Sequence, residues 1–310
     1  MQFPFTLKEN AQFDVLGFGT NAVDFLIRVP HYPEFNSKVE LSDYTRAAGG
    51  EIATTMVGLR RLGLRSSYIG RFGSDASGEI GMNSLRDEDV DLRYAERIDG
   101  ARTQIAFIII DERSGERTVI WRRDEKLHYS EADVPVEAVN DAKVLHFTPH
   151  DAQACLRLAA AARANGTIVS IDIDNVVEDV EPLLKSVDII IGSSDFLAKM
   201  FGMSDTRSAL SEMQQRFGAG VVGVTLGSAG SLLLCGGQFI ETKGFDVPGG
   251  CKDTTGAGDS FRVGLLYGLI TGEPVEASAR MANAVAALKC RSVGARTSLP
   301  TEQELISFLK

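Results

Sequence analysis

A carboxylate directly follows a run of small residues in the segment DTTGAGDS, residues 253–260. Gly256, Ala257 and Gly258 leave their backbone N–H groups accessible, and Asp259 comes next. The following apolar residues recur at helical spacing, which predicts a helix that begins near Gly258. Free N–H groups at a helix N-terminus bind anions, and an ionised carboxylate beside them can accept a proton from a hydroxyl that attacks a phosphoryl group. A glycine turn that only precedes a capped helix is the alternative, and the spacing alone leaves both open.

Other glycine-rich stretches compete for a binding role. Residues 17–22 fit the pattern GxGxxA after an apolar strand, which would suggest a dinucleotide-binding fold if a helix followed. A β-rich segment broken by Pro30 and Pro33 follows instead, which disfavours that fold. No GxxxxGK[ST] motif occurs, so the sequence excludes a P-loop. The stretch VTLGSAGSLLL, residues 224–234, reads as a strand, a turn and a second strand; its turn either borders a nucleotide or belongs to a plain hairpin.

Composition limits the classes of protein to consider. The chain has 310 residues, 44% of them hydrophobic, which is enough for one large domain. Its net charge of −10 disfavours binding to nucleic acid or to an anionic membrane. Four cysteines without a CxxC pair predict neither a disulfide framework nor a zinc site, so we expect a reducing, cytoplasmic compartment. No signal peptide is recognisable, and the apolar runs are too short to span a bilayer.

The second half of the chain alternates predicted strands and helices. An Ala-rich helix is expected over 151–166, with Asp151 as its N-cap and Gly166 just past its end. Short β-branched runs predict strands at 143–147, 167–173, 187–191 and 221–226. Buried strands separated by helices imply a doubly wound α/β fold with a mostly parallel sheet.

The first half differs, because its expected strands at 38–47 and 102–124 are not interleaved with helices. The latter segment reads as a hairpin with a glycine-containing turn. We expect a small β-sheet lid inserted into a single domain of residues 1–310, with lid strands from about 34–48 and 92–126. Edge strands of the main sheet are the alternative.

These features together resemble the PfkB, or ribokinase-like, family of sugar and nucleoside kinases. The resemblance covers nearly the whole chain and rests on Asp24, the Gly49-Gly50 pair, the GSDASG run of residues 73–78, the V-T-x-G-x-x-G turn and the D-T-x-G-A-G-D signature. It implies a doubly wound α/β domain with a small β lid, and transfer of the γ-phosphoryl group of ATP to a sugar hydroxyl, with Mg²⁺ as the metal.

The resemblance also implies roles for individual residues. Asp259 would be the catalytic base, and the Gly256, Ala257 and Gly258 amides would form the anion hole. The remaining assigned residues are Asp24, Gly49, Gly50 and Thr54 for the sugar; Ser193, Thr225, Gly227, Gly230 and Asn283 for the nucleotide; and Asp253 and Thr255 for a monovalent cation such as K⁺, with further ligands from the late loop 292–298.

Two positions depart from the family pattern. Thr54 stands where the family usually has an asparagine that touches the sugar. Ser193 and Phe196 stand in place of the N-x-x-E motif that organises Mg²⁺ through water, with Asp195 adjacent. In the lid, strand alternation sends Arg122 and Arg123 to opposite faces, so Arg123 either reaches the sugar or belongs to a solvated charge run.

The sequence therefore predicts an ATP-dependent kinase that acts on a primary hydroxyl of a small sugar, fructokinase- or ketohexokinase-like or ribokinase-like. A nucleoside kinase is one alternative. A catalytically weak, sugar-sensing binding protein on the same fold is the other. We also expect a homodimer formed through the lid, with Trp121 at the contact between the two lids.

Overall fold

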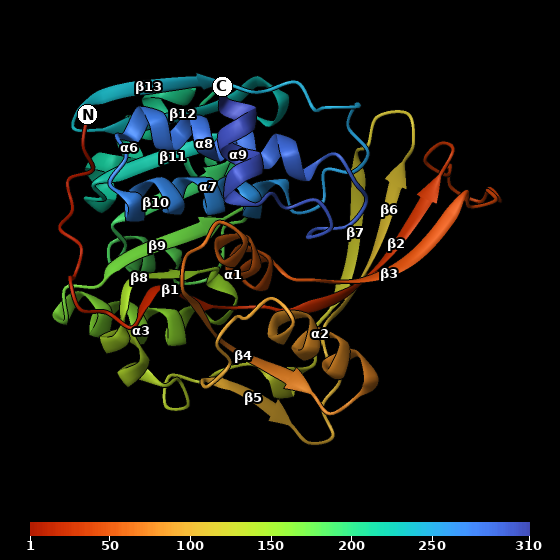
Figure 1. The fold of residues 1–310 in the computed structure, drawn as a ribbon, viewed down its shortest axis with the longest axis horizontal. Coiled ribbons are helices and arrows are strands. Elements are labelled where there is room, and N and C mark those ends of the chain that lie inside the picture. The colour runs from red at the N-terminus through yellow and green to blue at the C-terminus, as the bar shows by residue number, and fades with distance from the viewer.

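The computed structural model describes residues 1–310 and contains one large and one small β-sheet (Figure 1). The large sheet has nine strands in the order β13-β12-β11-β10-β9-β8-β1-β4-β5. Its strands are β1 (Phe13–Phe18), β4 (Ser66–Gly73), β5 (Ala95–Ile98), β8 (Ala142–Phe147), β9 (Ile168–Ile173), β10 (Ile189–Ser193), β11 (Val221–Thr225), β12 (Gly230–Cys235) and β13 (Gln238–Lys243). All neighbours pair in parallel except β11–β12 and β12–β13. This confirms the predicted fold class.

Helices cover both faces of the large sheet. They are α1 (Glu51–Arg61), α2 (Ala76–Arg86), α3 (Ala152–Ala164), α4 (Val180–Leu184), α5 (Ser194–Phe201), α6 (Thr206–Phe217), α7 (Ala257–Thr271), α8 (Val275–Lys289) and α9 (Glu302–Leu309). Strand residues alternate between two buried clusters: Leu16 packs with α3 to α6 on one face, and Val15 packs with α1, α2, α7, α8 and α9 on the other. The longest helices have 15 residues, and none is long and apolar enough to cross a membrane.

The small sheet stands out from one end of the large domain (Figure 1). Its strands, in the order β3-β2-β6-β7, are β2 (Ala22–Val29), β3 (Asp43–Gly49), β6 (Ile105–Asp111) and β7 (Arg117–Arg122). Its extent differs from the expected segments 34–48 and 92–126. Strand β2 lies before the first segment, and β5 within the second belongs to the large sheet. The strand expected at 38–47 begins only at Asp43.

The two faces of the small sheet have different surroundings. On the inner face, Asp24 pairs with Ala106 and Ala106 with Trp121, and neighbouring Leu26 and Ile108 are buried. On the outer face, cross-strand neighbours stack their exposed rings: Phe25 lies 5.0 Å from Phe107 and 6.2 Å from Tyr44, and Ile120 is exposed beside them. Trp121 therefore lies on the inner face, where its ring meets His150 edge-on at 6.2 Å. The expected contact of Trp121 with a second lid stays a prediction.

Candidate active site

Helix α7 begins where the glycine run ends. Gly256 is its N-cap, with a φ of +78° that favours glycine, and an added Cβ would lie 2.9 Å from the Cβ of Ala295. Ala257 N donates to Thr254 O at 3.1 Å, and the first intrahelical bond runs from Ser260 N to Gly256 O at 2.9 Å. The N–H groups between these two bonds, those of Gly258 and Asp259, have no helical acceptor. Free N–H groups at a helix N-terminus are suited to an anion; of the predicted Gly256, Ala257 and Gly258 amides, that of Ala257 is already taken up by Thr254 O.

Asp259 lies in the first turn of α7 and is half-buried. Burial raises the pKa of its carboxyl to about 8, and the nearby Glu51 carboxylate acts in the same direction. The guanidinium groups of Arg262 and Arg117 oppose this shift. A carboxyl that titrates near neutral pH is suited to accepting a proton during catalysis.

A buried ion pair fastens the N-terminal turn of α7 to the large sheet. Arg262 is 2% exposed, and its Nη2 lies 2.5 Å from Asp172 Oδ1 on β9. Nη2 also donates to Ile191 O on β10 at 3.0 Å, while Nη1 donates back to Gly258 O at 3.0 Å. The sequence analysis did not identify Arg262. A single arginine inside an otherwise apolar helix is the sequence feature that could have indicated its burial.

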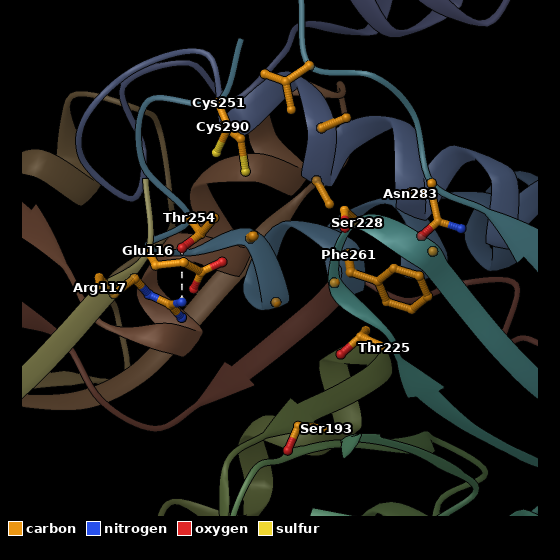
Figure 2. A pocket seen from close by; sticks show the side chains of 18 of the residues that line it. Glu116, Arg117, Ser193, Thr225, Ser228, Cys251, Thr254, Phe261, Asn283 and Cys290 are labelled. Atoms are coloured by element: carbon orange, nitrogen blue, oxygen red, sulfur yellow. Dashed lines mark hydrogen bonds between the residues drawn. The ribbon is translucent and has the colours of Figure 1, made fainter. Parts of the chain in front are cut away.

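A cavity of about 670 Å³ opens beside this helix end (Figure 2). Its walls include all five residues that the sequence analysis assigned to the nucleotide: Ser193, Thr225, Gly227, Gly230 and Asn283. Ala257 and Gly258 line the same cavity, so the anion-binding helix end forms part of its wall. The volume and the mixed lining suit a ligand such as a nucleotide.

The strands and the β11–β12 hairpin position this lining. Ser193 and Thr225 are register partners at the carboxyl ends of the parallel strands β10 and β11, where α/β sheets bind ligands. Asn283 on α8 is fixed by Nδ2 bonds to Ser231 Oγ at 3.0 Å and Thr242 O at 3.3 Å. The 224–234 segment is therefore a hairpin whose turn also borders the cavity.

The tip of the lid hairpin closes one side of the cavity. Gly115 O accepts bonds from both N and Oγ1 of Thr254, each at 3.2 Å. Arg117 on β7 donates from Nη1 to Thr254 Oγ1 at 3.1 Å, as the dashed line in Figure 2 marks. Ser114, Glu116 and Arg117 all line the cavity. Arg117 was missed in the sequence, because nothing there separates it from the other lid arginines.

A second subsite lies under the lid around Asp24. Asp24 is 4% exposed, and its side chain forms no hydrogen bond or ion pair within the protein. Burial raises the pKa of its carboxyl to about 6, and Arg296 opposes the shift. Its carboxylate packs over Gly49 so closely that a Cβ there would clash. A buried carboxylate without a protein donor takes its hydrogen bonds from water or from a ligand.

Arg296 links the elements around this subsite. Its Nε donates to Thr54 Oγ1 at 3.2 Å, Nη1 donates to Ser84 Oγ at 2.9 Å, and Nη2 donates to Gly49 O. Gly50 next to it is the N-cap of α1 with a φ of +91°. Three of the residues assigned to the sugar, Asp24, Gly49 and Thr54, thus surround one guanidinium that the sequence analysis did not identify.

The two subsites meet at the N-termini of α1 and α7. Thr55 Oγ1 on α1 lies 3.5 Å from Asp259 O, and the Glu51 carboxylate contributes to the pKa shift of Asp259. Burial lowers the pKa of Arg296, and Asp24 and Asp259 both act against that shift. Asp259 therefore lies between the Asp24 subsite and the cavity.

Arg123 is occupied by a different partner. It forms a two-bond ion pair with Asp151, at 3.0 Å to Oδ1 and 2.8 Å to Oδ2, and it donates to Leu127 O at 2.8 Å. The interpretation of Arg123 as part of a solvated charge run is wrong, because the pair is buried. Asp151 precedes α3 but makes no side-chain capping bond, since its carboxylate is taken up by this pair.

The residues present offer two carboxylates to Mg²⁺. Ser193 Oγ accepts from Phe196 N and caps α5, and no three side chains of metal-ligand type cluster anywhere in the chain. Asp174 and Asp195 do line the cavity. This donor set fits Mg²⁺, which in nucleotide sites uses one or two carboxylates together with phosphate oxygens and water.

The expected monovalent-cation site does not fit a metal ion. Both carboxylate oxygens of Asp253 accept backbone N–H bonds, from Thr255 and from Gly294 at 2.8 Å each. The Lys289 ammonium lies 3.9 Å from the same carboxylate. Two unit charges of like sign about 4 Å apart repel by roughly 4 kcal/mol in a protein environment. Thr255 Oγ1 is the one unpartnered side-chain oxygen at this place, far short of a shell of oxygens.

Comparisons with known proteins agree with this geometry. The family model for pfkB family carbohydrate kinases matches residues 14–302. A fructokinase from Klebsiella pneumoniae is 31% identical over 83% of this chain and 90% of its own length. A nucleoside kinase from Methanothermobacter thermautotrophicus is 26% identical over 94% of both chains.

The fold has solved counterparts. The structure of Arabidopsis thaliana ribokinase complexed with ribose and ATP superposes with a TM-score of 0.80 at 23% identity, covering 96% of this chain and 99% of that one. The family match over nearly the whole chain confirms the resemblance seen in the sequence. The chain therefore belongs to the pfkB family of carbohydrate kinases and is a phosphotransferase with an alcohol group as acceptor.

Proposed function

We propose that the protein phosphorylates a primary hydroxyl of a small sugar with ATP, and that Asp259 is the general base. The observation that carries this proposal is the place of Asp259, between a nucleotide-sized cavity and a buried carboxylate that lacks protein donors. A fructokinase-like, ketohexokinase-like or ribokinase-like substrate fits a subsite that offers a buried carboxylate as an acceptor for hydroxyl groups.

The acceptor would bind under the lid. Sugar hydroxyls donate to the Asp24 carboxylate, which replaces the hydrogen bonds that burial denies it. The small residues at Gly49 and Gly50 let the sugar approach the backbone. The acceptor hydroxyl then faces Asp259, which removes its proton as the oxygen attacks the γ-phosphoryl group.

The phosphoryl group would be held from two sides. The Gly258 and Asp259 amides at the start of α7 donate to its oxygens. Arg117 approaches from the lid tip and adds a positive charge that is present only when the lid is closed. Mg²⁺, held by Asp174 or Asp195, would neutralise charge on the phosphate oxygens when it is bound.

A nucleoside acceptor is the second candidate. Trp121 is 55% exposed on the inner face of the lid and lies beside His150. An exposed indole above the acceptor subsite can stack on a base. This exposed ring is the observation that favours a nucleoside kinase as the second candidate.

One panel experiment tests these alternatives. ADP formation from Mg-ATP is measured with D-fructose, D-ribose, sugar acids and adenosine, for the wild type, Asp259→Asn and the exposed control Asp87→Asn. The proposal predicts one strong sugar acceptor and a fall in kcat of about 100- to 10,000-fold for Asp259→Asn alone. Turnover that Asp259→Asn leaves intact contradicts the base assignment. Sugar-dependent thermal stabilisation without turnover supports the sugar-sensing alternative.

We also propose a homodimer through the outer face of the lid. Phe25, Phe107, Tyr44 and Ile120 form an apolar surface on a sheet that is exposed on that side, and such surfaces mark contacts between proteins. Light scattering should give the dimer mass for the wild type and the monomer mass for Phe107→Glu. Ile306→Glu, an exposed apolar position on α9, is the control. A monomeric wild type contradicts the proposal.

A further inference from the structure

A lysine ammonium is fully enclosed behind the loop that precedes α7. Lys289, the last residue of α8, is 0% exposed. Its Nζ donates to Asp253 O at 2.7 Å and lies 3.9 Å from Asp253 Oδ2. Lysine is almost never fully buried unless it has a partner of opposite charge. Here the partner is the first residue of the DTTGAGD signature.

Asp253 is just as enclosed and is surrounded by donors. It is 0% exposed, and its carboxylate accepts N–H bonds from Thr255 and Gly294. In the late loop, Ser298 Oγ donates to Lys289 O at 2.5 Å, so this hydroxyl oxygen is directed at a carbonyl. A metal ion needs oxygen lone pairs, whereas the groups that face Asp253 present N–H bonds and an ammonium.

The Lys289 ammonium lies beside Asp253, which connects the segment before α7 with the late loop that contains Gly294. Asp253 and Thr255 lead directly into the Gly256 N-cap, and Gly294 belongs to the loop that contacts Gly256 through Ala295. Lys252 N also donates to Cys290 O at 2.9 Å, which joins the end of α8 to the same segment. A positive charge at this point stabilises the Asp253 carboxylate. Through Asp253 it also stabilises the conformation of the turn that leads to the Gly256 N-cap.

We propose that the Lys289 ammonium takes the place of the monovalent cation expected at Asp253 and Thr255, so that the enzyme carries this positive charge in its own chain and needs no K⁺. Burial lowers the pKa of Lys289 and the Asp253 carboxylate opposes that shift. Both oxygens that lie near Nζ belong to Asp253, one as a hydrogen-bond acceptor and one as the opposite charge. This inference rests on the proposed kinase function only for its kinetic test.

The experiment compares wild type, Lys289→Ala and Lys289→Met in KCl and in tetramethylammonium chloride at equal ionic strength. Lys8→Met is the control, because Lys8 also donates to a carbonyl, Val139 O at 3.3 Å, and Val139 packs on the opposite face of the large sheet from α8. Three readouts are taken: kcat/KM with D-fructose or D-ribose, the thermal midpoint, and anomalous density from Rb⁺ in crystals. The last two need no substrate.

The proposal predicts a wild type with the same kcat/KM and thermal midpoint in both salts and no Rb⁺ beside Asp253. In Lys289→Ala, a displaced anion-binding turn should lower kcat/KM by about 10- to 100-fold without K⁺, and K⁺ should restore much of it. Lys289→Met fills the space without a charge and should stay impaired in both salts. Lys8→Met should behave as the wild type.

Several outcomes would overturn the proposal. If K⁺ activates or stabilises the wild type, or if Rb⁺ binds beside Asp253, the protein needs the ion even though Lys289 is present. Equal activity of Lys289→Ala without K⁺ shows that the charge has no role. If Lys289→Ala does not fold, the wild-type measurements alone still decide. If no acceptor is turned over, the kinase proposal fails, while the thermal and Rb⁺ readouts still test Lys289.

Discussion

The pH dependence of phosphoryl transfer should report the unusual titration of Asp259. The group acts as a base only when it is ionised, and burial together with Glu51 raises its pKa to about 8. Because the ionised form gains population as pH rises, kcat/KM for the acceptor should rise with pH up to this value. A pKa of about 8 leaves roughly 1% ionised at pH 6 and roughly half at pH 8, so the expected rise is about 50-fold.

Glu51→Gln should shift this profile in a known direction. The variant keeps the size of the side chain and removes a negative charge that disfavours ionisation of Asp259. The midpoint of the profile should therefore move to lower pH, and kcat/KM at pH 7 should increase relative to its own plateau. Glu79→Gln, at an exposed position on α2, is the matched control and should leave the midpoint unchanged.

The assay is ADP release coupled to a chromogenic readout, with the coupling enzymes in excess at every pH. The full profile between pH 5.5 and 9.5 is needed, since a single pH cannot separate a shift from a loss of rate. A wild-type profile that is flat across this range, or a Glu51→Gln midpoint that moves upward, would refute the electrostatic reasoning for Asp259.

Three further predictions concern the arginines. Arg262→Met leaves Asp172 buried without its partner and should cost about 3–5 kcal/mol of unfolding free energy, seen as a lower thermal midpoint. Adding Asp172→Leu should recover much of this loss. A double variant that is no more stable than the single one would contradict the prediction. Arg296→Gln should raise the acceptor KM about tenfold and leave the KM for ATP unchanged, because its contacts lie around Asp24; an equal rise in both would indicate general damage. Arg117→Gln should lower kcat about 10- to 100-fold while thermal stability stays constant, with Arg117→Lys intermediate.

The predictable part of the structure followed from local patterns. Glycine punctuation and helical spacing placed the start of α7 near Gly258, and it begins at Ala257. Alternating strands and helices predicted the parallel sheet. The nucleotide residues, Ser193 to Asn283, do line one cavity. These features could be predicted because the chain segments that carry them have recognisable spacing or motifs.

The rest depends on contacts between distant segments. Strand β2 joins the lid because of its pairing with β6, and strand periodicity does not specify a partner. Arg262, Lys289 and Arg296 were missed because a charged residue in a helix or loop normally faces solvent. Their burial becomes understandable only through Asp172, Asp253 and Asp24, which lie far away in sequence.

The bond between the lid tip and Thr254 has a consequence for water. The four-stranded sheet that covers the Asp24 subsite also supplies Arg117 to the wall of the cavity, and Gly115 at the tip of its hairpin accepts bonds from Thr254. In the proposed reaction, closing the lid would therefore exclude solvent from the acceptor subsite and bring Arg117 to the phosphate in one movement. While no acceptor holds the lid down, bound ATP faces a cradle without its arginine. In the proposed reaction, the contact that assists transfer to a sugar would thus also restrain the transfer of the phosphoryl group to water.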